Sequence, residues 1–185
     1  VLQGHQEIIW SVATNDDGSL VASGSDDHTV RIWDSHTGQC LRTIQGFTSR
    51  VWSVAFNMQS PLLASGNDEA VKLWSVTTGQ CLKTLKGCPQ LNWSVIFMPN
   101  SAHLASGGQD QMVRIWDWQT STCIQTSQKH PTYVYAISHH PEEPVLASAS
   151  ANTAYVWDVD TQRMIVTLEG HGAQIWTVEF STNGA

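Results

Sequence analysis

The stretch SGSDDHTVRIWD occupies residues 23–34. Close copies follow as SGNDEAVKLWS at 65–75, SGGQDQMVRIWD at 106–117 and SASANTAYVWD at 148–158. The tryptophans of the four copies lie 41, 42 and 41 residues apart, at Trp33, Trp74, Trp116 and Trp157. Self-similarity at a fixed interval is the sequence signature of a repeat architecture. The chain is therefore predicted to contain four successive copies of one structural unit.

A second marker keeps the same period. A Gly-His pair opens the first unit, and the equivalent pairs step by 42, 41, 42 and 41 residues through Gly4-His5, Gly46-Phe47, Gly87-Cys88, Lys129-His130 and Gly170-His171. Helical repeats of this length would show apolar faces with a period of about 3.6 residues, and the units lack them. A unit near 41 residues with strand-like segments matches a propeller blade.

Each unit contains four short apolar runs bounded by turn residues. In the first unit these runs are Ile8–Ala13, Leu20–Ser23, Val30–Trp33 and Cys40–Ile44. They are rich in Val, Ile and Trp, which predicts strands, and their short connections require antiparallel neighbours. The runs are apolar on both faces, as expected for a small sheet packed between two others. The prediction is an all-β chain.

Composition narrows the classes of function. The 185 residues are 41% hydrophobic and 14% charged, which is typical of a globular protein, and the net charge of −7 disfavours nucleic acid and acidic partners. No apolar run approaches the roughly 20 residues of a membrane-spanning helix, so no membrane partner is expected. No phosphate-binding glycine loop, nucleophile elbow or metal-binding helix is present. We therefore expect no enzyme activity, no cofactor and no metal.

Cysteine usage bears on the compartment. Cys40, Cys81 and Cys123 occupy the same place in successive units, so they would lie on separate sheets rather than form disulfides. Unpaired cysteines favour a reducing compartment. A cytoplasmic location is the expectation.

These repeats closely resemble the WD-repeat β-propeller family, whose units run from a Gly-His pair to a Trp-Asp pair. The resemblance covers the whole chain and implies four four-stranded blades plus the first strand of a fifth, Ile175–Phe180. The repeats are then 4–45, 46–86, 87–128 and 129–169, with 170–185 starting the fifth. Four blades make an open arc, which is either a partial ring or half of an eight-bladed assembly.

The resemblance also implies a buried tetrad of hydrogen-bonded side chains in each blade. In the first blade the members are His5, Ser23, Asp27 and Trp33. Carried over, the other blades retain only part of the set, namely Asp68 and Trp74, then Ser106, Asp110 and Trp116, then His130, Ser148 and Trp157. The second blade has Phe47 in place of His and a turn that is one residue short, which leaves the role of Ser65 open. The third blade has Cys88 in place of His, and the fourth has Ala151 in place of Asp.

An aromatic residue lies five residues after each histidine position. In WD-repeat proteins this position, the one two residues before it, and the residue preceding the tetrad aspartate lie on the rim of the channel and contact partners. The implied rim residues are Ile8, Trp10, Asp26, Arg50, Trp52, Asn67, Leu91, Trp93, Gln109, Tyr133, Tyr135, Gln174 and Trp176. Alternatively, the aromatic rings pack against one another around the channel.

Three hypotheses for the function follow. The first is a scaffold or sensor module that presents the rim to a protein or peptide partner, most similar to bacterial WD-repeat arrays attached to signalling ATPase modules. The second is a self-assembling element in which two copies form a homodimer that closes one ring. The third is small-molecule binding in the central channel, which would need polar groups converging in an apolar pocket.

Overall fold

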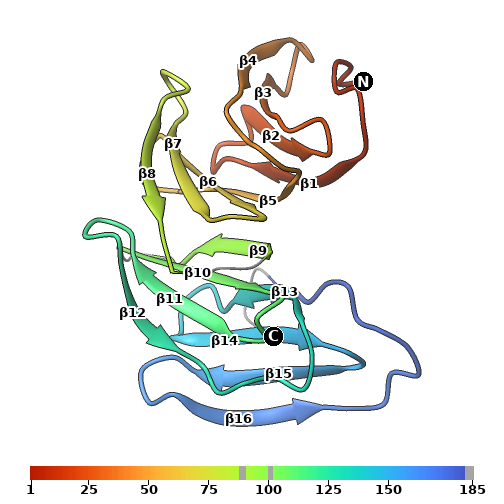
Figure 1. Cartoon of the computed structure of the whole chain (residues 1–185), viewed down its shortest axis with the longest axis vertical. Helices are drawn as coiled ribbons and strands as arrows, with labels where there is room; N and C mark the ends of the chain where they lie inside the picture. Colours follow the sequence, from red (N-terminus) through yellow and green to blue (C-terminus); the bar gives the residue numbers. More distant parts are fainter. Residues whose placement is uncertain (88–90, 100–101, 182–185) are drawn as a thin grey trace.

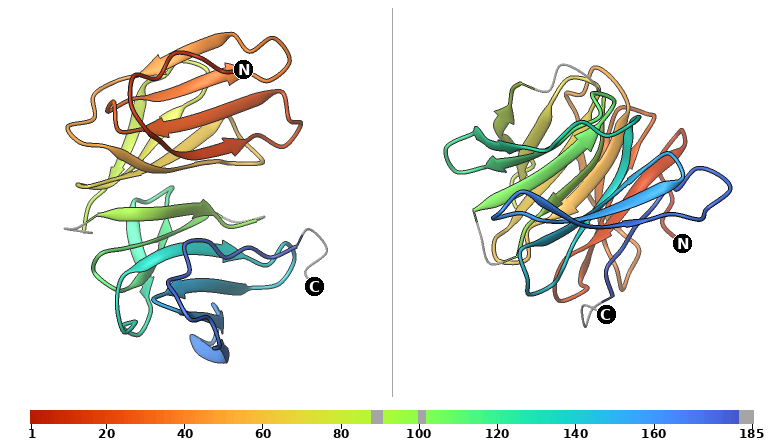
Figure 2. Two further views of the ribbon diagram at one scale, coloured as in Figure 1. Left: turned by 90° about the vertical axis from the view of Figure 1, so that its right-hand side faces the viewer. Right: turned by 90° about the horizontal axis from the view of Figure 1, so that it is seen from below.

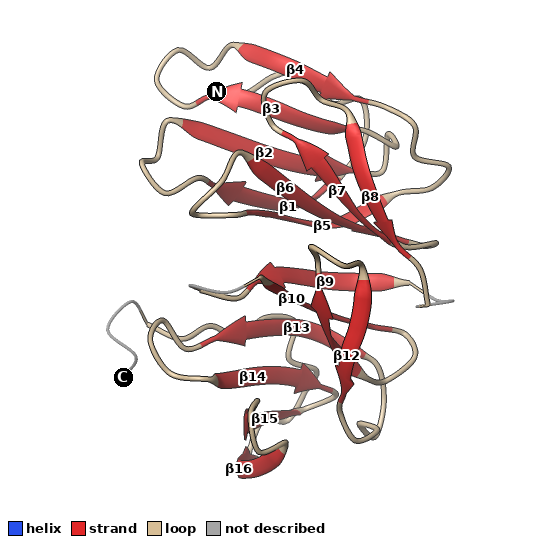
Figure 3. Ribbon diagram, turned by 90° about the vertical axis from the view of Figure 1, so that its left-hand side faces the viewer, coloured by secondary structure: helices blue, strands red, loops and turns tan. Residues whose placement is uncertain are grey.

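The computed structural model describes residues 1–87, 91–99 and 102–181. Sixteen strands and no helix are found in this part of the chain (Figure 3). The first sheet contains β1 (Ile9–Thr14), β2 (Leu20–Ser25), β3 (Val30–Asp34) and β4 (Cys40–Ile44). The second sheet contains β5 (Val51–Phe56), β6 (Leu62–Asn67), β7 (Val71–Ser75) and β8 (Cys81–Leu85). The fold class expected from the sequence is confirmed.

The third and fourth sheets repeat the pattern. The third contains β9 (Asn92–Phe97), β10 (His103–Gly108), β11 (Val113–Asp117) and β12 (Thr122–Thr126). The fourth contains β13 (Val134–His139), β14 (Val145–Ser150), β15 (Thr153–Asp158) and β16 (Arg163–Leu168). Each sheet is antiparallel, with its strands paired in chain order. We refer to the sheets as blades 1 to 4.

The blades follow one another along an open arc (Figure 1). The first strands, β1, β5, β9 and β13, lie on the inner side of the arc, and the last strands, β4, β8, β12 and β16, lie on the outer side. Because the strands alternate in direction, the turns after the first and third strands lie at the same end of every blade. The turn after the second strand lies at the other end of the blade (Figure 2).

Each hydrophobic cluster is shared by two neighbouring blades. The first cluster joins Val30 and Ile32 of blade 1 to Val51 and Trp74 of blade 2. The second cluster joins blades 2 and 3, and the third joins blades 3 and 4, through equivalent positions. A sheet that is apolar on both faces buries them only between neighbours, as in other stacked repeats. The double-sided apolar pattern of the strands is thereby explained.

A glycine in the second strand of three blades lets the next blade approach closely. A Cβ atom added at Gly24 would lie 2.8 Å from a methyl group of Val51, and one at Gly66 would lie 2.6 Å from the carbonyl oxygen of Asn92. Gly107 meets Val134 in the same way at 2.7 Å. These distances are shorter than van der Waals contact, so the glycines set the spacing between blades.

One expected element is absent. Ile175–Phe180 is not a strand, because no second strand in the described residues pairs with it. The segment is instead held by single hydrogen bonds, from Ile175 N to the Ala151 carbonyl over 2.7 Å and from Phe180 N to the Ser138 hydroxyl over 3.1 Å. The structure assigns no strand to this segment, and its place at the start of a fifth blade stays a prediction.

We predict that Gly66→Ala destabilises the protein, because the added methyl group meets a backbone oxygen of the next blade. The expected loss in the free energy of unfolding is about 1–3 kcal/mol, measured by chemical denaturation. Gly172→Ala is the matched control, since nothing lies within 4 Å of a Cβ at that position. Equal stability of the two variants would contradict the assignment of Gly66 as a spacer.

Candidate functional site

Three hydrogen bonds join four side chains in blade 1. The Trp33 indole N–H donates to the Ser23 hydroxyl over 2.8 Å. The same hydroxyl lies 2.7 Å from Nε2 of His5, and Nδ1 of His5 lies 2.7 Å from Oδ2 of Asp27. The segment before β1, strand β2, the following turn and strand β3 each supply one member. The structure therefore brings together the whole tetrad implied by the family resemblance.

Asp27 is the carboxylate of the tetrad, and it has several hydrogen-bond donors besides His5. It also accepts bonds from Thr29 Oγ1 at 2.6 Å, Thr29 N at 3.0 Å and Gln6 N at 3.1 Å. Burial on its own would raise the pKa of Asp27, but hydrogen bonds from Thr29, His5 and Gln6 outweigh it and lower the pKa to about 2. The carboxylate is therefore charged in the folded protein at neutral and mildly acidic pH.

Blade 2 replaces the histidine by an aromatic contact. The Phe47 ring lies 4.9 Å from the Trp74 ring, centroid to centroid, and the Trp74 N–H donates to Ser65 over 2.8 Å. Asp68 was expected in this tetrad, and that expectation is wrong. It accepts a 2.6 Å hydrogen bond from the Trp52 indole instead, because Phe47 offers it no imidazole N–H.

Blade 3 keeps the indole bond, and its carboxylate pairs with an arginine. The Trp116 N–H donates to Ser106 over 2.9 Å. Asp110, the carboxylate expected in this tetrad, forms an ion pair with Arg114 on the following strand. Its place in the tetrad stays a prediction. Cys88, at the histidine position, lies outside the described residues.

In blade 4 a backbone carbonyl takes the place of the missing aspartate. His130 Nε2 lies 2.8 Å from the Ser148 hydroxyl, and its Nδ1 lies 3.2 Å from the carbonyl oxygen of Gln111 in blade 3. Burial lowers the pKa of His130, and the bond to the carbonyl opposes this only in part. The Trp157 indole has no hydrogen-bond partner among the described residues, so Trp157 does not complete this tetrad.

The rim aromatics form one continuous series of ring contacts. Trp10 lies 4.9 Å from Trp52, and Trp52 lies 6.1 Å from Trp93, between ring centroids. Trp93 stacks on Tyr135 at 4.9 Å, and Tyr135 meets Trp176 edge-on at 5.1 Å. We call these five residues the aromatic series. The exposed fraction is 44% for Trp10 and 70% for Trp176, so both ends of the series are open to solvent.

Two neighbouring rim residues connect blades 1 and 2. Nε of Arg50 lies 3.2 Å from Oδ1 of Asp26, and the Arg50 guanidinium lies 5.0 Å from the centre of the Trp52 ring. Asn67 was also expected on the rim, but it is fully buried, and its Oδ1 accepts the Ala70 N–H over 3.0 Å. The expectation that Asn67 contacts a partner is therefore wrong, because its amide is needed to hold a turn.

The remaining rim residues differ in exposure. Ile8 is exposed, whereas Leu91, Gln109, Tyr133 and Gln174 are half-buried. The carbonyl of Leu91 accepts the Gln109 N–H over 3.0 Å, and the Tyr133 ring lies 5.1 Å from Trp93. Leu91 and Gln109 belong to blade 3, Tyr133 precedes β13 of blade 4, and Gln174 follows β16. These side chains differ in their chemistry. The rim is therefore not symmetric from blade to blade.

A set of serine hydroxyls that the sequence interpretation missed connects the inner strands. The hydroxyls of Ser11, Ser53 and Ser94 accept the backbone N–H of Val54, Val95 and Ile137 respectively, each over 3.1 Å. Each serine directly follows an aromatic of the series and reaches the next blade. The repeated Trp-Ser-Val at 10–12, 52–54 and 93–95 was the available signal. In blade 4 the hydroxyl is that of Ser138, which accepts the Phe180 N–H.

The described residues hold no evident metal or disulfide site. No group of three His, Cys, Asp or Glu side chains in that part of the chain could hold a metal ion. Cys40, Cys81 and Cys123 are unpaired. No helix among these residues is long and apolar enough to cross a membrane. The inner face of the arc has a cavity of about 650 Å³ lined by the aromatic series and the strands that carry it.

We predict that Asp27→Ala lowers the free energy of unfolding more than Asp68→Ala does. The first change leaves several partly buried donors without an acceptor, at about 1–3 kcal/mol, whereas the second removes one bond to a rim indole, at about 1 kcal/mol. Because the folded-state pKa of Asp27 is depressed to about 2, its contribution is present above the ordinary pKa of 3.8 and is lost as the pH falls toward 2. Denaturant midpoints measured at several pH values test this. Equal losses for the two variants at neutral pH would contradict the role of Asp27.

Comparison with known proteins identifies the repeats. The family model "WD domain, G-beta repeat" matches residues 1–34, 38–75, 79–117 and 121–158. A 45-residue segment is 49% identical to a ribosome biogenesis protein BOP1 homolog of Drosophila virilis, covering 24% of this chain and 6% of that protein. A 54-residue segment is 46% identical to eukaryotic translation initiation factor 3 subunit I of Botryotinia fuckeliana (strain B05.10), covering 29% of this chain and 16% of that protein.

These alignments span only a small part of each relative. Both relatives are eukaryotic, so the expected likeness to bacterial arrays beside signalling ATPase modules stays a prediction. The family matches cover most of the chain and end at the four tryptophan strands that carry the tetrads. The chain belongs to the WD-repeat family.

Proposed function

We propose that this chain is a non-catalytic interaction scaffold or sensor module that binds a protein or peptide partner through the aromatic series and the residues around it. The observation that supports the proposal best is the continuity of the series across the whole arc, with Trp10 and Trp176 open to solvent. Tryptophan, tyrosine and arginine contribute disproportionately to binding energy at protein interfaces. One relative is a subunit of a translation initiation factor, which is consistent with work inside an assembly.

Packing and binding are compatible for this surface. The ring contacts hold each indole in one orientation, which reduces the side-chain entropy lost on association. The asymmetry around the rings, with the Arg50–Asp26 pair on one side and Tyr133 on another, suits an irregular protein surface. The unpaired cysteines support a reducing compartment, and we propose the cytoplasm.

Small-molecule binding on the inner face is less well supported. Such a site needs polar groups free to converge on a ligand. The hydroxyls of Ser53 and Ser94, which line the inner cavity, are already acceptors for backbone N–H groups of the next blade. We therefore favour a partner that covers the rim over a ligand held within the channel.

We predict that a Trp10→Ala/Trp52→Ala variant loses capture of its partner in a pull-down, because it removes one end of the aromatic series. Leu82→Ala on the outermost strand of blade 2 is the matched control, since this exposed side chain lies far from the inner face. Circular dichroism would verify that both variants keep their strands. Undiminished capture by the folded double variant would refute the rim assignment.

A second candidate is self-assembly, in which two copies of the chain form a homodimer that closes one ring. Val12 of blade 1 is 66% exposed, whereas the equivalent Val54 and Val95 are 5% and 2% exposed because a preceding blade covers them. At the other end of the arc, Val166 and Leu168 of β16 are also exposed. These faces have the apolar chemistry of the three internal interfaces. Another blade would therefore bury them.

We predict that the 185-residue chain has the molar mass of a dimer in solution, measured by light scattering during size-exclusion chromatography. Val12→Asp should shift the mass to that of the monomer, because a carboxylate would be buried at the new interface. Ile124→Asp is the control and should leave the mass unchanged, because Ile124 is exposed on β12 at the outer side of the arc. A wild-type chain that stays monomeric at all concentrations would refute self-assembly.

A further inference from the structure

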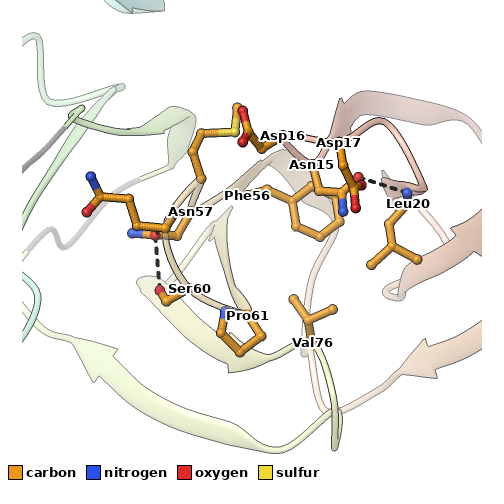
Figure 4. Close-up of a pocket in the computed structure, with 11 residues that line it drawn as sticks. Asn15, Asp16, Asp17, Leu20, Phe56, Asn57, Ser60, Pro61 and Val76 are labelled. Atoms are coloured by element: carbon orange, nitrogen blue, oxygen red, sulfur yellow. Dashed lines mark hydrogen bonds between the residues drawn. The ribbon is translucent and has the colours of Figure 1, made fainter.

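A separate groove lies at the end of the blades opposite the aromatic rim. It runs between the turns that follow the first strands of the blades. One cavity of about 370 Å³ opens between the β1–β2 turn and the β5–β6 turn. Figure 4 shows Asp16 and Asp17 on one side of it, Asn57 and Pro61 on the other, and Phe56 between them. Leu20 and Val76 complete its apolar lining.

A second cavity of about 350 Å³ continues the first. The two share Asp16 and the segment from Phe56 to Gln59, and the second extends to Phe97, Pro99 and His139. Neighbouring turns from the blades thus line one continuous depression. We call the two cavities together the turn groove.

The turn groove combines a rigid apolar floor with an adaptable wall. Phe56 and Phe97 are buried in the interfaces between blades, at 5% and 7% exposure, so their positions are held by the cores. Met58 is 59% exposed at the junction of the two cavities. An unbranched thioether side chain adapts its shape to a partner, which makes exposed methionine common at binding surfaces.

The charged side chains in the lining of this groove are carboxylates. Asp16 and Asp17 are exposed on its wall, and the residues that line the two cavities include no Lys or Arg. The Ser19 hydroxyl and N–H donate to Asp17 and lower its pKa, so this carboxylate is charged at neutral pH. His139 is the other titratable side chain of the lining. Arg42 lies behind the lining residue Val76, and its Nε donates to the Val76 carbonyl over 3.0 Å.

Acidic residues also outnumber basic ones over this whole end of the blades. Half of the sixteen acidic residues lie in or next to the turns at this end, namely Asp16, Asp17, Asp34, Asp117, Glu142, Glu143, Asp158 and Asp160. Arg163 lies at the same end, and Arg42 and Lys83 contact turns there through their donor groups. The field around the groove therefore attracts cationic segments and repels phosphate-bearing partners.

We propose that the turn groove binds an extended peptide segment in which Lys or Arg stands beside a long apolar side chain such as Leu. The apolar side chain enters the cavity over Phe56 against Met58, and the cation pairs with Asp16 and Asp17. The site lies at the opposite end of the blades from the aromatic series. It would let the arc hold a basic segment independently of a partner on the rim.

The test is fluorescence anisotropy with a short fluorescein-labelled peptide in which Lys and Leu alternate. The 185-residue chain should bind this peptide, and binding should weaken as salt rises. Replacing Leu by Ser, or Lys by Glu, in the peptide should remove most of the binding. In the protein, Asp16→Asn and Met58→Gln should each weaken binding about threefold to fivefold.

The controls separate this site from general attraction and from the rim. Glu169→Gln removes one carboxylate beyond β16, away from the groove, and should leave binding unchanged. Trp10→Ala, which alters the rim, should also leave it unchanged, so failure of the proposed rim function and failure of the groove are distinguishable. Equal binding of the Lys-Ser and Lys-Leu peptides would reduce the effect to net charge. That result, or full binding by folded Asp16→Asn and Met58→Gln variants, would overturn the proposal.

Discussion

The packing of one blade against the next is the constraint on which the rest of the structure depends. All three hydrophobic clusters cross a boundary between blades. Since each sheet is apolar on both faces, a single blade would leave much of its apolar surface in water. Gly24, Gly66 and Gly107 permit the close approach, and the hydroxyls of Ser11, Ser53 and Ser94 fix the register of adjacent inner strands.

The polar tetrads are secondary to this packing, and the surroundings of the buried indole differ from blade to blade. Trp33, Trp74 and Trp116 all donate to a serine of the second strand. What lies beyond that serine varies, from the His5–Asp27 pair in blade 1 to an aromatic contact with Phe47 in blade 2. Once the apolar clusters hold the blades together, the loss of a tetrad member is tolerated.

The two candidate surfaces are consequences of the same topology. Because the strands run up and down, every second turn lies at the same end of the blades. Repeated positions that are far apart in the sequence therefore lie close together there. At one end this places aromatic residues in a continuous series. At the other end it gathers carboxylates around a groove whose floor is formed by Phe56 and Phe97 of the interblade cores. Rigidity at both ends comes from the blades beneath them.

The sequence by itself determined the period, the four strands of each blade and the positions of the tetrad indoles, because turn residues and apolar runs are local signals that recur. Only the tertiary structure decided the partners of several polar groups. Asp68 accepts a hydrogen bond from Trp52, Asp110 pairs with Arg114, and His130 lies against the Gln111 carbonyl of another blade. Asn67 became buried, and Ile175–Phe180 stayed unpaired. A hydrogen-bond partner depends on which donors and acceptors lie within about 3 Å after packing, and neither spacing nor composition contains that distance.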